Sequence, residues 1–445
     1  MKARQRAVRD IFGIFGTRAA WSAMGVVSGV ILARWLGPHD RGILTLALLL
    51  PSTVVTFVKL GISQANVYYI NREREPVVQV ASNAVALALV SGAVAAVVVW
   101  LVRGILLATV LRGVPDWAVA LALVRVPLLL LDNYLYGILQ ATGKFGVYNV
   151  RLLLSEVLRL VLVTVSLVVF HWGLFAAVCI YTLVGAVNVT WLSVAIRRQI
   201  PFTLAVNRPL LLRQLSFGVK SYIQTVTSHL LLRVDVYLVS YFLTPSDTAF
   251  YALALHFTEM VLEFPQAVGL VLFPRLTSLP EEQVHRLTAQ ACRRTLLMTA
   301  PAALALAVLG PYVITLWYGE PYAPAGAPLP WAAVGVAAMS IFVIVTRDFT
   351  SRGNQRVNII AGLFALVSNV ALNFFLIPRF GIVGAAQATA ISYSGACVVL
   401  LAFYVFASRI SVVEVLVPKI DDLRYLWRTA RQGFARTLPR SEHED

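Results

Sequence analysis

The chain has 445 residues, of which 59% are hydrophobic and only 13% are charged, and its mean hydropathy is +0.78. A soluble domain carries roughly a quarter of its residues as charged side chains, so this composition excludes a soluble globular protein. The net charge of +16 comes without a stacking platform or a recognition motif, and nucleic acid is therefore not an expected partner.

Long apolar runs follow one another along the chain. Runs of about 20 to 28 residues can cross a hydrocarbon layer of ~30 Å as tilted helices. Backbone groups in lipid must be satisfied within the segment, which favours helices over open strands. The sequence predicts an all-α polytopic membrane protein with about twelve spans, near residues 10–35, 43–70, 78–103, 116–142, 147–170, 173–196, 213–243, 247–273, 288–316, 328–352, 356–377 and 381–408.

Lys and Arg side chains gather in alternate loops and at both ends of the chain. With the N-terminus inside, most of these loop cations fall on the inner side, as the positive-inside rule requires. Both termini are therefore expected in the cytoplasm. The basic N-terminus does not resemble a cleaved signal peptide, because its apolar stretch is too long and no small-residue cleavage site follows.

A short polar turn occurs twice in the sequence. From Leu36 the chain reads "LGPHDRGILTLAL", and from Leu243 it reads "LTPSDTAFYALAL", with Leu, Pro, Asp, Leu, Ala and Leu repeated at an offset of 207 residues. Six spans separate the two copies, so both face the same side, and the repeats are parallel. This predicts two six-helix lobes about a pseudo-twofold axis along the membrane normal, with a central cleft. The expected parts are an N-terminal lobe, a cytoplasmic linker, a C-terminal lobe and a cytoplasmic tail, over 1–198, 199–212, 213–408 and 409–445 respectively.

Charged residues inside the spans are the candidates for a binding site. A charge at membrane depth costs about 2.5–3.5 kcal/mol and normally faces protein or water. Polar residues recur at helical spacing in span two (Thr56, Lys59, Ser63, Asn66), in span eight (His256, Glu259, Glu263, Gln266) and in span seven (Lys220, Gln224, Thr227, Asp235). The residues predicted to line the cavity are Arg18, Lys59, Asn66, Lys220, Gln224, Arg233 and Arg347.

Three acidic residues in the spans, Asp235, Glu259 and Glu263, are candidates for ion coupling. Glu259 and Glu263 lie one helical turn apart, and two such carboxylates in a low dielectric resist ionising together. They fit a proton site, and the alternative is a role as hydrogen-bond partners of nearby cations. The three cysteines and six histidines have no metal-ligand spacing, so no metal and no cofactor is expected beyond H⁺ or Na⁺ for coupling.

Other charges within the spans are expected to pair structurally. Glu156 and Arg159 are three residues apart on one helix and are predicted to form an ion pair. Arg125 and Asp132 share a face of span four, and a buried pair between them is the expectation weighed against a place in the cavity.

Four segments carry a family resemblance across about residues 10–408. They are, in order, "VILARWLGPHDRGILTLAL", "LLLRVDVYLVSYFL", "YALALHFTEMVLEFPQAVGLVLFPRL" and "VITLWYGEPYAPAGAPLPWAA". They resemble the first-to-second-span turn, the seventh span, the eighth span and the ninth-to-tenth connection of the oligosaccharide flippases. That family, which includes the O-antigen and polysaccharide repeat-unit flippases, belongs to the multidrug/oligosaccharidyl-lipid/polysaccharide exporter superfamily.

The resemblance implies a membrane transporter rather than an enzyme. Its implied substrate is an undecaprenyl-diphosphate-linked oligosaccharide repeat unit, moved by alternating access from the cytoplasmic to the outer leaflet of the bacterial inner membrane for surface polysaccharides such as lipopolysaccharide O-antigen. Basic central cavities, described for the family, match the Lys and Arg residues inside these spans. The alternatives are a cation-coupled multidrug exporter of the same superfamily and a membrane glycosyltransferase or ligase, although the outer loops are short for an enzyme.

The tail after residue 409 is expected to be a separate element. Leu423, Leu426, Trp427, Ala430 and Phe434 share one helical face, with arginines elsewhere around the helix. This pattern predicts a basic amphipathic helix on the anionic lipids of the inner leaflet. Docking of polysaccharide-assembly enzymes is the alternative role. One chain contains both lobes, so a monomer is sufficient, and the sequence leaves the oligomeric state open.

Overall fold

A computed structural model of the chain describes residues 2–220 and 222–424, and the regular structure in these ranges is helical throughout, which confirms the predicted all-α fold. The side chains at 2–20, 145, 220, 223 and 224 lie outside the description. The helices are α1 Lys2–Val58, α2 Ile62–Asn71, α3 Val77–Leu101, α4 Arg103–Ala108, α5 Asp116–Ala141, α6 Phe145–Val163, η1 Thr164–Val169, α7 Leu174–Arg197, α8 Arg208–Lys220, α9 Ile223–Phe242, α10 Pro245–Leu276, α11 Glu281–Tyr318, η2 Glu320–Gly326, α12 Leu329–Ser351, α13 Gln355–Ser408 and α14 Val412–Leu416.

Described helices cover most of each predicted span, and spans two and seven are interrupted between α1 and α2 and between α8 and α9. Eight helical segments are long and apolar enough to cross a membrane, and two of these, in α1 and α13, each cover two predicted spans. They do so because each helix bends sharply at a glycine, Gly37 (φ 73°, ψ 172°) in α1 and Gly381 (φ 59°, ψ −139°) in α13. Glycine adopts such left-handed φ values without the steric cost that a Cβ brings. The chain is therefore a multi-pass helical membrane protein.

Backbone packing divides the described chain into two compact units. The first holds the residues up to 252 together with 315–324, and the second holds 253–314 and the residues from 325 onward. These units differ from the expected lobes because α8, α9 and the start of α10 pack with the N-terminal helices. The lobe boundaries, which rest on topology, stay a prediction. Most of the predicted amphipathic tail helix, residues 425–445, lies outside the described residues.

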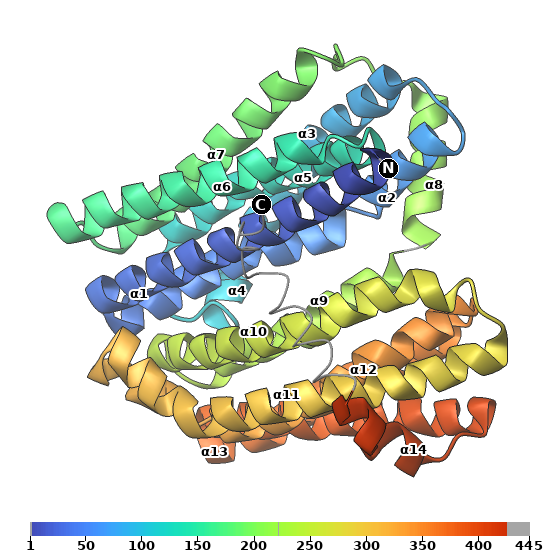
Figure 1. The fold of residues 1–445 in the computed structure, drawn as a ribbon. Coiled ribbons are helices and arrows are strands. Elements are labelled where there is room, and N and C mark those ends of the chain that lie inside the picture. The colour runs from blue at the N-terminus through green and yellow to red at the C-terminus, as the bar shows by residue number, and fades with distance from the viewer. Residues whose placement is uncertain (1, 221, 425–445) are drawn as a thin grey trace, which may run out of the picture. The chain divides into compact units, whose positions relative to one another are not determined.

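The first unit is built around α5, which packs against α1, α2, α3 and α7 (Figure 1). Val126, Leu130, Tyr134 and Ile138, at helical spacing along α5, are fully buried in its core. In α3, a Cβ at Gly92 would lie 2.6 Å from the Cα of Pro127 in α5. Small residues at such crossings let helix backbones approach closely, which drives packing where lipid removes the hydrophobic driving force.

The two copies of the repeated turn meet within the first unit. Pro245, the first residue of α10, packs on α1 so closely that a Cβ at Gly42 would lie 1.7 Å from the Pro245 carbonyl oxygen. The start of α10 is fixed by a reciprocal cap, in which the Thr244 hydroxyl donates to Asp247 Oδ2 (2.6 Å) and the Asp247 N–H donates to Thr244 Oγ1 (3.2 Å). Each copy therefore helps to position the other.

Residues 315–324 also belong to the first unit, where they bind the part of α1 just before the bend at Gly37. Arg34 donates hydrogen bonds to the carbonyl oxygens of Leu316 (2.8 Å) and Trp317 (2.7 Å), which end α11. The hydroxyl of Tyr322, buried in η2, donates to the Ala33 carbonyl (3.2 Å). These bonds satisfy carbonyl groups that a helix end leaves without an intrahelical partner.

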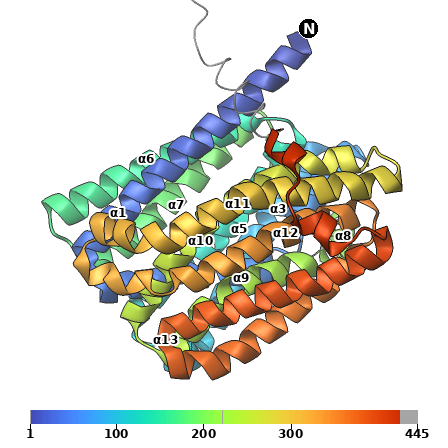
Figure 2. The same cartoon turned by 60° about the horizontal axis from the view of Figure 1, so that its bottom comes forward.

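The second unit contains α12 and the two arms of α13, which lie side by side (Figure 2). At the bend, a Cβ on Gly384 would lie 2.2 Å from the Leu376 carbonyl oxygen. Fully buried Asn369 links the arms by donating to Thr389 Oγ1 (3.2 Å) and Ser392 Oγ (3.3 Å). Buried polar bonds of this kind hold helices together in lipid.

Candidate functional site

Predicted span two is a broken helix. It leaves α1 at Val58 and resumes as α2 at Ile62, with positive φ at Leu60 (43°) and Gly61 (68°). The Lys59 carbonyl oxygen, exposed by the break, accepts from the Ile62 N–H (3.0 Å) and from the Tyr134 hydroxyl (3.2 Å). Irregular backbone at membrane depth is tolerated where protein or a water-filled cavity surrounds it, and transporters place their binding sites at such breaks.

Two glycines fix the position of the break. A Cβ on Gly61 would lie 2.5 Å from the Gly218 carbonyl oxygen, and a Cβ on Gly218 would lie 2.2 Å from that of Leu60. No other residue fits at this crossing of the chain with α8 unless the backbones separate. The break is therefore a packed feature of the first unit.

Lys59 stands at the break beside α9. Its side chain is half-buried, and within the described part of the chain its ammonium has no hydrogen-bond or ion-pair partner. The charges of Lys59 and Arg233 both act on the His229 ring, whose Nε2 lies 3.3 Å from Thr53 Oγ1. We name Lys59, His229 and Arg233 the basic group. Such side chains can replace the lost hydration of an anion with charge-assisted hydrogen bonds.

The break divides the predicted polar stripe of span two, so Asn66 does not lie on one face with Lys59. Asn66 is fully buried, accepts a hydrogen bond from Gln214 Nε2 (2.9 Å) and donates to the Tyr134 carbonyl (3.4 Å). Ser63 donates to the Asn133 carbonyl (2.9 Å). The positive φ angles reset the helical phase, so the residues after Gly61 face α5 and α8 and Asn66 lies in a packed interface instead of on a water-facing stripe with Lys59.

The predicted arc of span seven is likewise split between two helices. Lys220 ends α8 and Gln224 belongs to α9, so the two do not share one continuous helical face. The structure does not describe the side chains of Lys220 and Gln224, nor that of Arg18 in α1. Asp235, on α9, is buried and accepts hydrogen bonds from the Tyr251 hydroxyl (2.7 Å) and from the Val236 N–H (2.9 Å).

The polar stripe of predicted span eight lies on α10, in the second unit. Glu259 is half-buried, whereas His256, Glu263 and Gln266 are exposed. A polar face on so apolar a helix is costly against lipid, which favours contact with water or with polar groups.

Arg347, on α12, packs against α10 within the second unit. A Cβ on Gly269 would lie 3.1 Å from the Arg347 Nε, and this buried nitrogen has no hydrogen-bond partner in the described residues. A buried donor without a partner costs about 1–3 kcal/mol. Arg347 therefore has a buried donor that the described residues leave unsatisfied.

The remaining intramembrane charges form structural contacts in the first unit. Glu156 and Arg159 are hydrogen-bonded, as predicted. Asp132 pairs with Arg151 at 2.6 Å, so its expected pairing with Arg125 is wrong. The Arg125 guanidinium instead lies 5.7 Å from the centre of the Tyr181 ring. A shared helical face does not decide the partner when a neighbouring helix offers a closer cation.

Sequence reasoning missed two polar residues of the first unit. His229 precedes Arg233 by four residues, and this spacing on one helix face was a signal for the basic group. Gln214, fully buried, bridges Asn66 and Asn83 by donating to the first (2.9 Å) and accepting from the second (3.0 Å). Nothing local marks Gln214, because both of its partners lie far away in the sequence.

A family model described as "Polysaccharide biosynthesis protein" matches residues 31–327, which include the basic group and the α10 stripe. The chain belongs to the polysaccharide biosynthesis protein family. The resemblance to the oligosaccharide flippases drawn from the sequence is thereby confirmed.

Relatives of this family member include two named transport proteins. It is 22% identical over 394 residues to a putative O-antigen transporter of Shigella flexneri, covering 85% of this chain and 92% of that one. It is 28% identical over 165 residues to a probable low-salt glycan biosynthesis flippase, Agl15, of Haloferax volcanii, and this match spans only 35% of that relative and 36% of this chain. Neither is named as an enzyme, which agrees with the prediction of a transporter.

Solved structures share the fold of this family member. The lipid II flippase MurJ in an inward closed conformation has a TM-score of 0.77 at 14% identity, covering 98% of this chain and 94% of that one. An inward-facing multidrug resistance transporter of the MATE family, in the MOP superfamily, has a TM-score of 0.73 at 16% identity, covering 87% and 94%. Both are polytopic helical membrane proteins, and the fold class predicted from the sequence agrees with theirs.

Proposed function

We propose that this member of the polysaccharide biosynthesis protein family is a flippase for lipid-linked oligosaccharides. Its substrate is an undecaprenyl-diphosphate-linked repeat unit, moved from the cytoplasmic to the outer leaflet of the bacterial inner membrane by alternating access. The named O-antigen transporter, matched over most of both chains, supports this assignment. A monomer is sufficient for the task, and polysaccharide-assembly enzymes are the proposed protein partners.

The observation that carries the proposal is the basic group at the broken helix. A diphosphate cannot cross hydrocarbon without its water shell unless cations and hydrogen-bond donors replace that shell. The Lys59 ammonium has no partner among the described residues. Its charge and that of Arg233 both act on His229, so the three side chains are close enough to interact electrostatically. The cations Lys59 and Arg233 beside a helix break suit an anionic head group, whereas a cationic drug would be repelled by them.

Flipping can be measured directly in proteoliposomes. The purified chain is reconstituted with a fluorescent undecaprenyl-diphosphate oligosaccharide, and a membrane-impermeant quencher reports the label in the outer leaflet. We expect label to exchange between leaflets far faster than in protein-free liposomes. Exchange at the protein-free rate, combined with efflux of a cationic dye by the same preparation, would instead assign the multidrug exporter function.

We also propose that both termini face the cytoplasm. Reporter fusions after Arg74, Arg198 and Arg356 should be cytoplasmic, because inner loops carry the excess of Lys and Arg. Fusions near His39 and Ser246 should report the outer side. An outside signal at Arg198 would contradict the six-plus-six arrangement of the spans.

Coupling to H⁺ or Na⁺ is proposed for the carboxylates of the α10 stripe. If Glu259 or Glu263 carries a coupling proton, its change to Gln should abolish the response of flipping to a pH gradient while leaving substrate binding intact. Glu259 is half-buried and Glu263 is exposed, so the two are changed singly. The measurement is the flipping rate with and without a gradient. A normal response in both single variants rules out this coupling site.

A further inference from the structure

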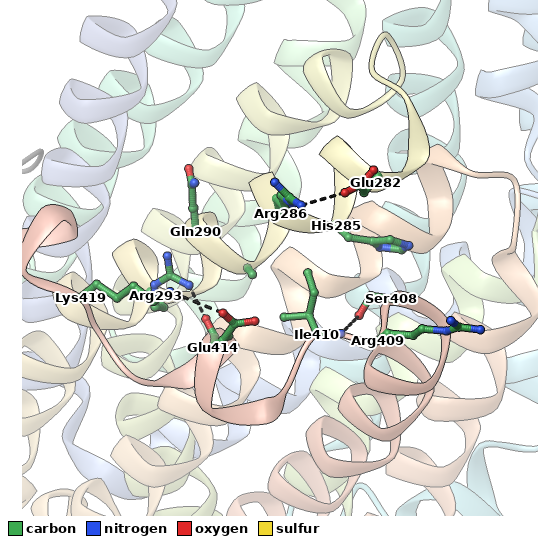
Figure 3. Close-up of a pocket in the computed structure, with 11 residues that line it drawn as sticks. Glu282, His285, Arg286, Gln290, Arg293, Ser408, Arg409, Ile410, Glu414 and Lys419 are labelled. Atoms are coloured by element: carbon green, nitrogen blue, oxygen red, sulfur yellow. Dashed lines mark hydrogen bonds and ion pairs between the residues drawn. The ribbon is translucent and has the colours of Figure 1, made fainter.

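The end of the second unit contains a cavity that the transport site does not use. It measures about 490 Å³, within the usual range for small-ligand pockets. Its walls come from the first turns of α11, the end of α13, α14 and Lys419 (Figure 3). We call it the C-terminal pocket. It lies beyond the apolar stretches of these helices, where the chain leaves the membrane-spanning part.

The chain after α13 forms one wall of the C-terminal pocket. Arg409, with φ 57°, ends α13 and turns the chain into α14, whose N-terminus is capped by the Ser411 hydroxyl. Buried Asp422 then ties the segment to α11 by accepting from Arg293 Nε (2.7 Å) and Arg294 Nε (3.1 Å). A second hydrogen bond runs from Arg293 to the Glu414 carbonyl. The wall is therefore fastened by charge-assisted hydrogen bonds.

Asp422 is charged in this arrangement. Burial alone disfavours its ionised form, but hydrogen bonds from Arg293, from the Lys419 N–H and from Arg294 hold the pKa of the carboxyl below its ordinary value. A depressed carboxyl pKa means that the contribution to stability is complete above the unfolded-state pKa, near 4, and is lost only when the pH falls through the lower folded-state value. The wall accordingly stays attached at neutral pH.

Cations outnumber carboxylates around the C-terminal pocket. Its ionisable lining consists of Glu282, His285, Arg286, Arg293, Arg409, Glu414 and Lys419. Arg286 forms an ion pair with Glu282 (2.8 Å). Lys419 Nζ lies 3.6 Å from Glu414 Oε1, and the side chains of Lys419 and Glu414 are each about half exposed. The Arg409 guanidinium has no ion pair or hydrogen bond within the described residues. The pocket thus has positive charge that its own walls do not neutralise.

Apolar side chains are also exposed on the segment that follows α13. Val413, Val417, Ile420 and Leu423 are each more than half exposed, as described residues of the chain after α13. Valine and leucine side chains exposed at the end of spanning helices suit the boundary between head groups and acyl chains. A ligand that combines an anionic head with an acyl chain would contact both features.

We propose that the C-terminal pocket binds a phosphate group, and that its source is the head group of an anionic membrane lipid. Basic pockets between spanning helices are suited to phospholipid head groups, because Arg and Lys bind phosphate oxygens by charge-assisted hydrogen bonds. Arg409 and Lys419, which lie at opposite ends of the pocket lining (Figure 3), both contribute to the positive charge that attracts the phosphate. This site is separate from the basic group at Lys59 and does not depend on the transported substrate.

The test is a titration of the delipidated, full-length chain in detergent with phosphatidylglycerol, read as the shift in melting temperature and as bound lipid in native mass spectrometry. The double variant Arg409→Gln/Lys419→Gln should bind phosphatidylglycerol about thirtyfold more weakly, from the loss of two cations at the membrane surface. The matched control, Arg275→Gln/Arg356→Gln, removes two exposed cations of the second unit outside the pocket and should bind as the unmodified chain does.

Two further arms decide the ligand. Glu414→Gln removes a carboxylate from the pocket but keeps the backbone carbonyl that Arg293 holds, so phosphatidylglycerol should bind more tightly. Millimolar inorganic phosphate should produce no comparable shift, and zwitterionic phosphatidylcholine should bind more weakly. Equal loss in the pocket and control variants, or unchanged binding in both, would overturn the site. A full shift with inorganic phosphate alone would overturn the lipid as its source.

Discussion

Replacing Lys59 by Ala should reduce the flipping rate by about ten- to a hundredfold, the equivalent of one lost charge-assisted hydrogen bond of roughly 1.5–3 kcal/mol. The ammonium has no described partner in the protein, so the truncation removes a contact to substrate without stranding another charge. Folding should be spared, because the bonds at the helix break are made by the Lys59 carbonyl oxygen. The measurement is the initial exchange rate in proteoliposomes, corrected for the amount of reconstituted protein.

Two control variants separate charge from position. Lys59→Arg should keep much of the rate, since either cation can bind a phosphate, although their geometries differ. Lys144→Ala should flip as the unmodified chain does, because Lys144 is bound to the Gln199 side chain in a loop. A well-folded Lys59→Ala protein with a normal rate would contradict the assignment and turn attention to Arg233 and Arg347.

Gly42→Ala should strongly reduce the stability of the protein. The new Cβ would lie 1.7 Å from the carbonyl oxygen and 2.4 Å from the carbonyl carbon of Pro245, and neither backbone atom can rotate away as a side chain can. The chain segments must separate, and overpacking of this kind costs about 3 kcal/mol or more. We expect a lower melting temperature and less monodisperse protein on size-exclusion chromatography in detergent.

Gly185→Ala is the matched control for this variant. Gly185 lies in α7 of the same unit, and no heavy atom lies within 4 Å of the position that its Cβ would take. Alanine favours helix over glycine by up to ~1 kcal/mol, so this variant should be neutral or slightly more stable. If Gly42→Ala melts at the same temperature as Gly185→Ala, the two copies of the repeated turn do not pack as described.

The spans were predictable because their signal is local. An apolar run has only one way to satisfy its backbone in lipid, so helix follows from composition, and the Gly-Pro of the first repeated turn marked the bend at Gly37. The broken helix was not predictable in the same way. Gly61 sits inside an apolar run where a glycine is often tolerated in a helix, and the positive φ of Leu60 has no signature in its residue type.

The same distinction between local signals and long-range packing applies to the site residues. Lys59 could be found because a lysine inside a span needs an explanation, and Glu156 could be paired with Arg159 because both lie on one helix. Asn66 could not be placed, because its direction depends on a change of helical phase five residues earlier. The partner of Asp132 depends on how α6 packs against α5, and no spacing within span four contains that information.

The bonds between Arg34 and the end of α11 bear on how the chain is made. The carbonyls that Arg34 binds belong to Leu316 and Trp317, and the tyrosine bound to Ala33 is Tyr322. These residues are synthesised long after Arg34. The hydrogen bonds at the end of the first arm of α1 can therefore form only late in synthesis. During that interval the Arg34 side chain and the Ala33 carbonyl lack these partners. Shortened chains that stop before Leu316 would lack all three of these bonds and would leave the end of the first arm of α1 unsecured.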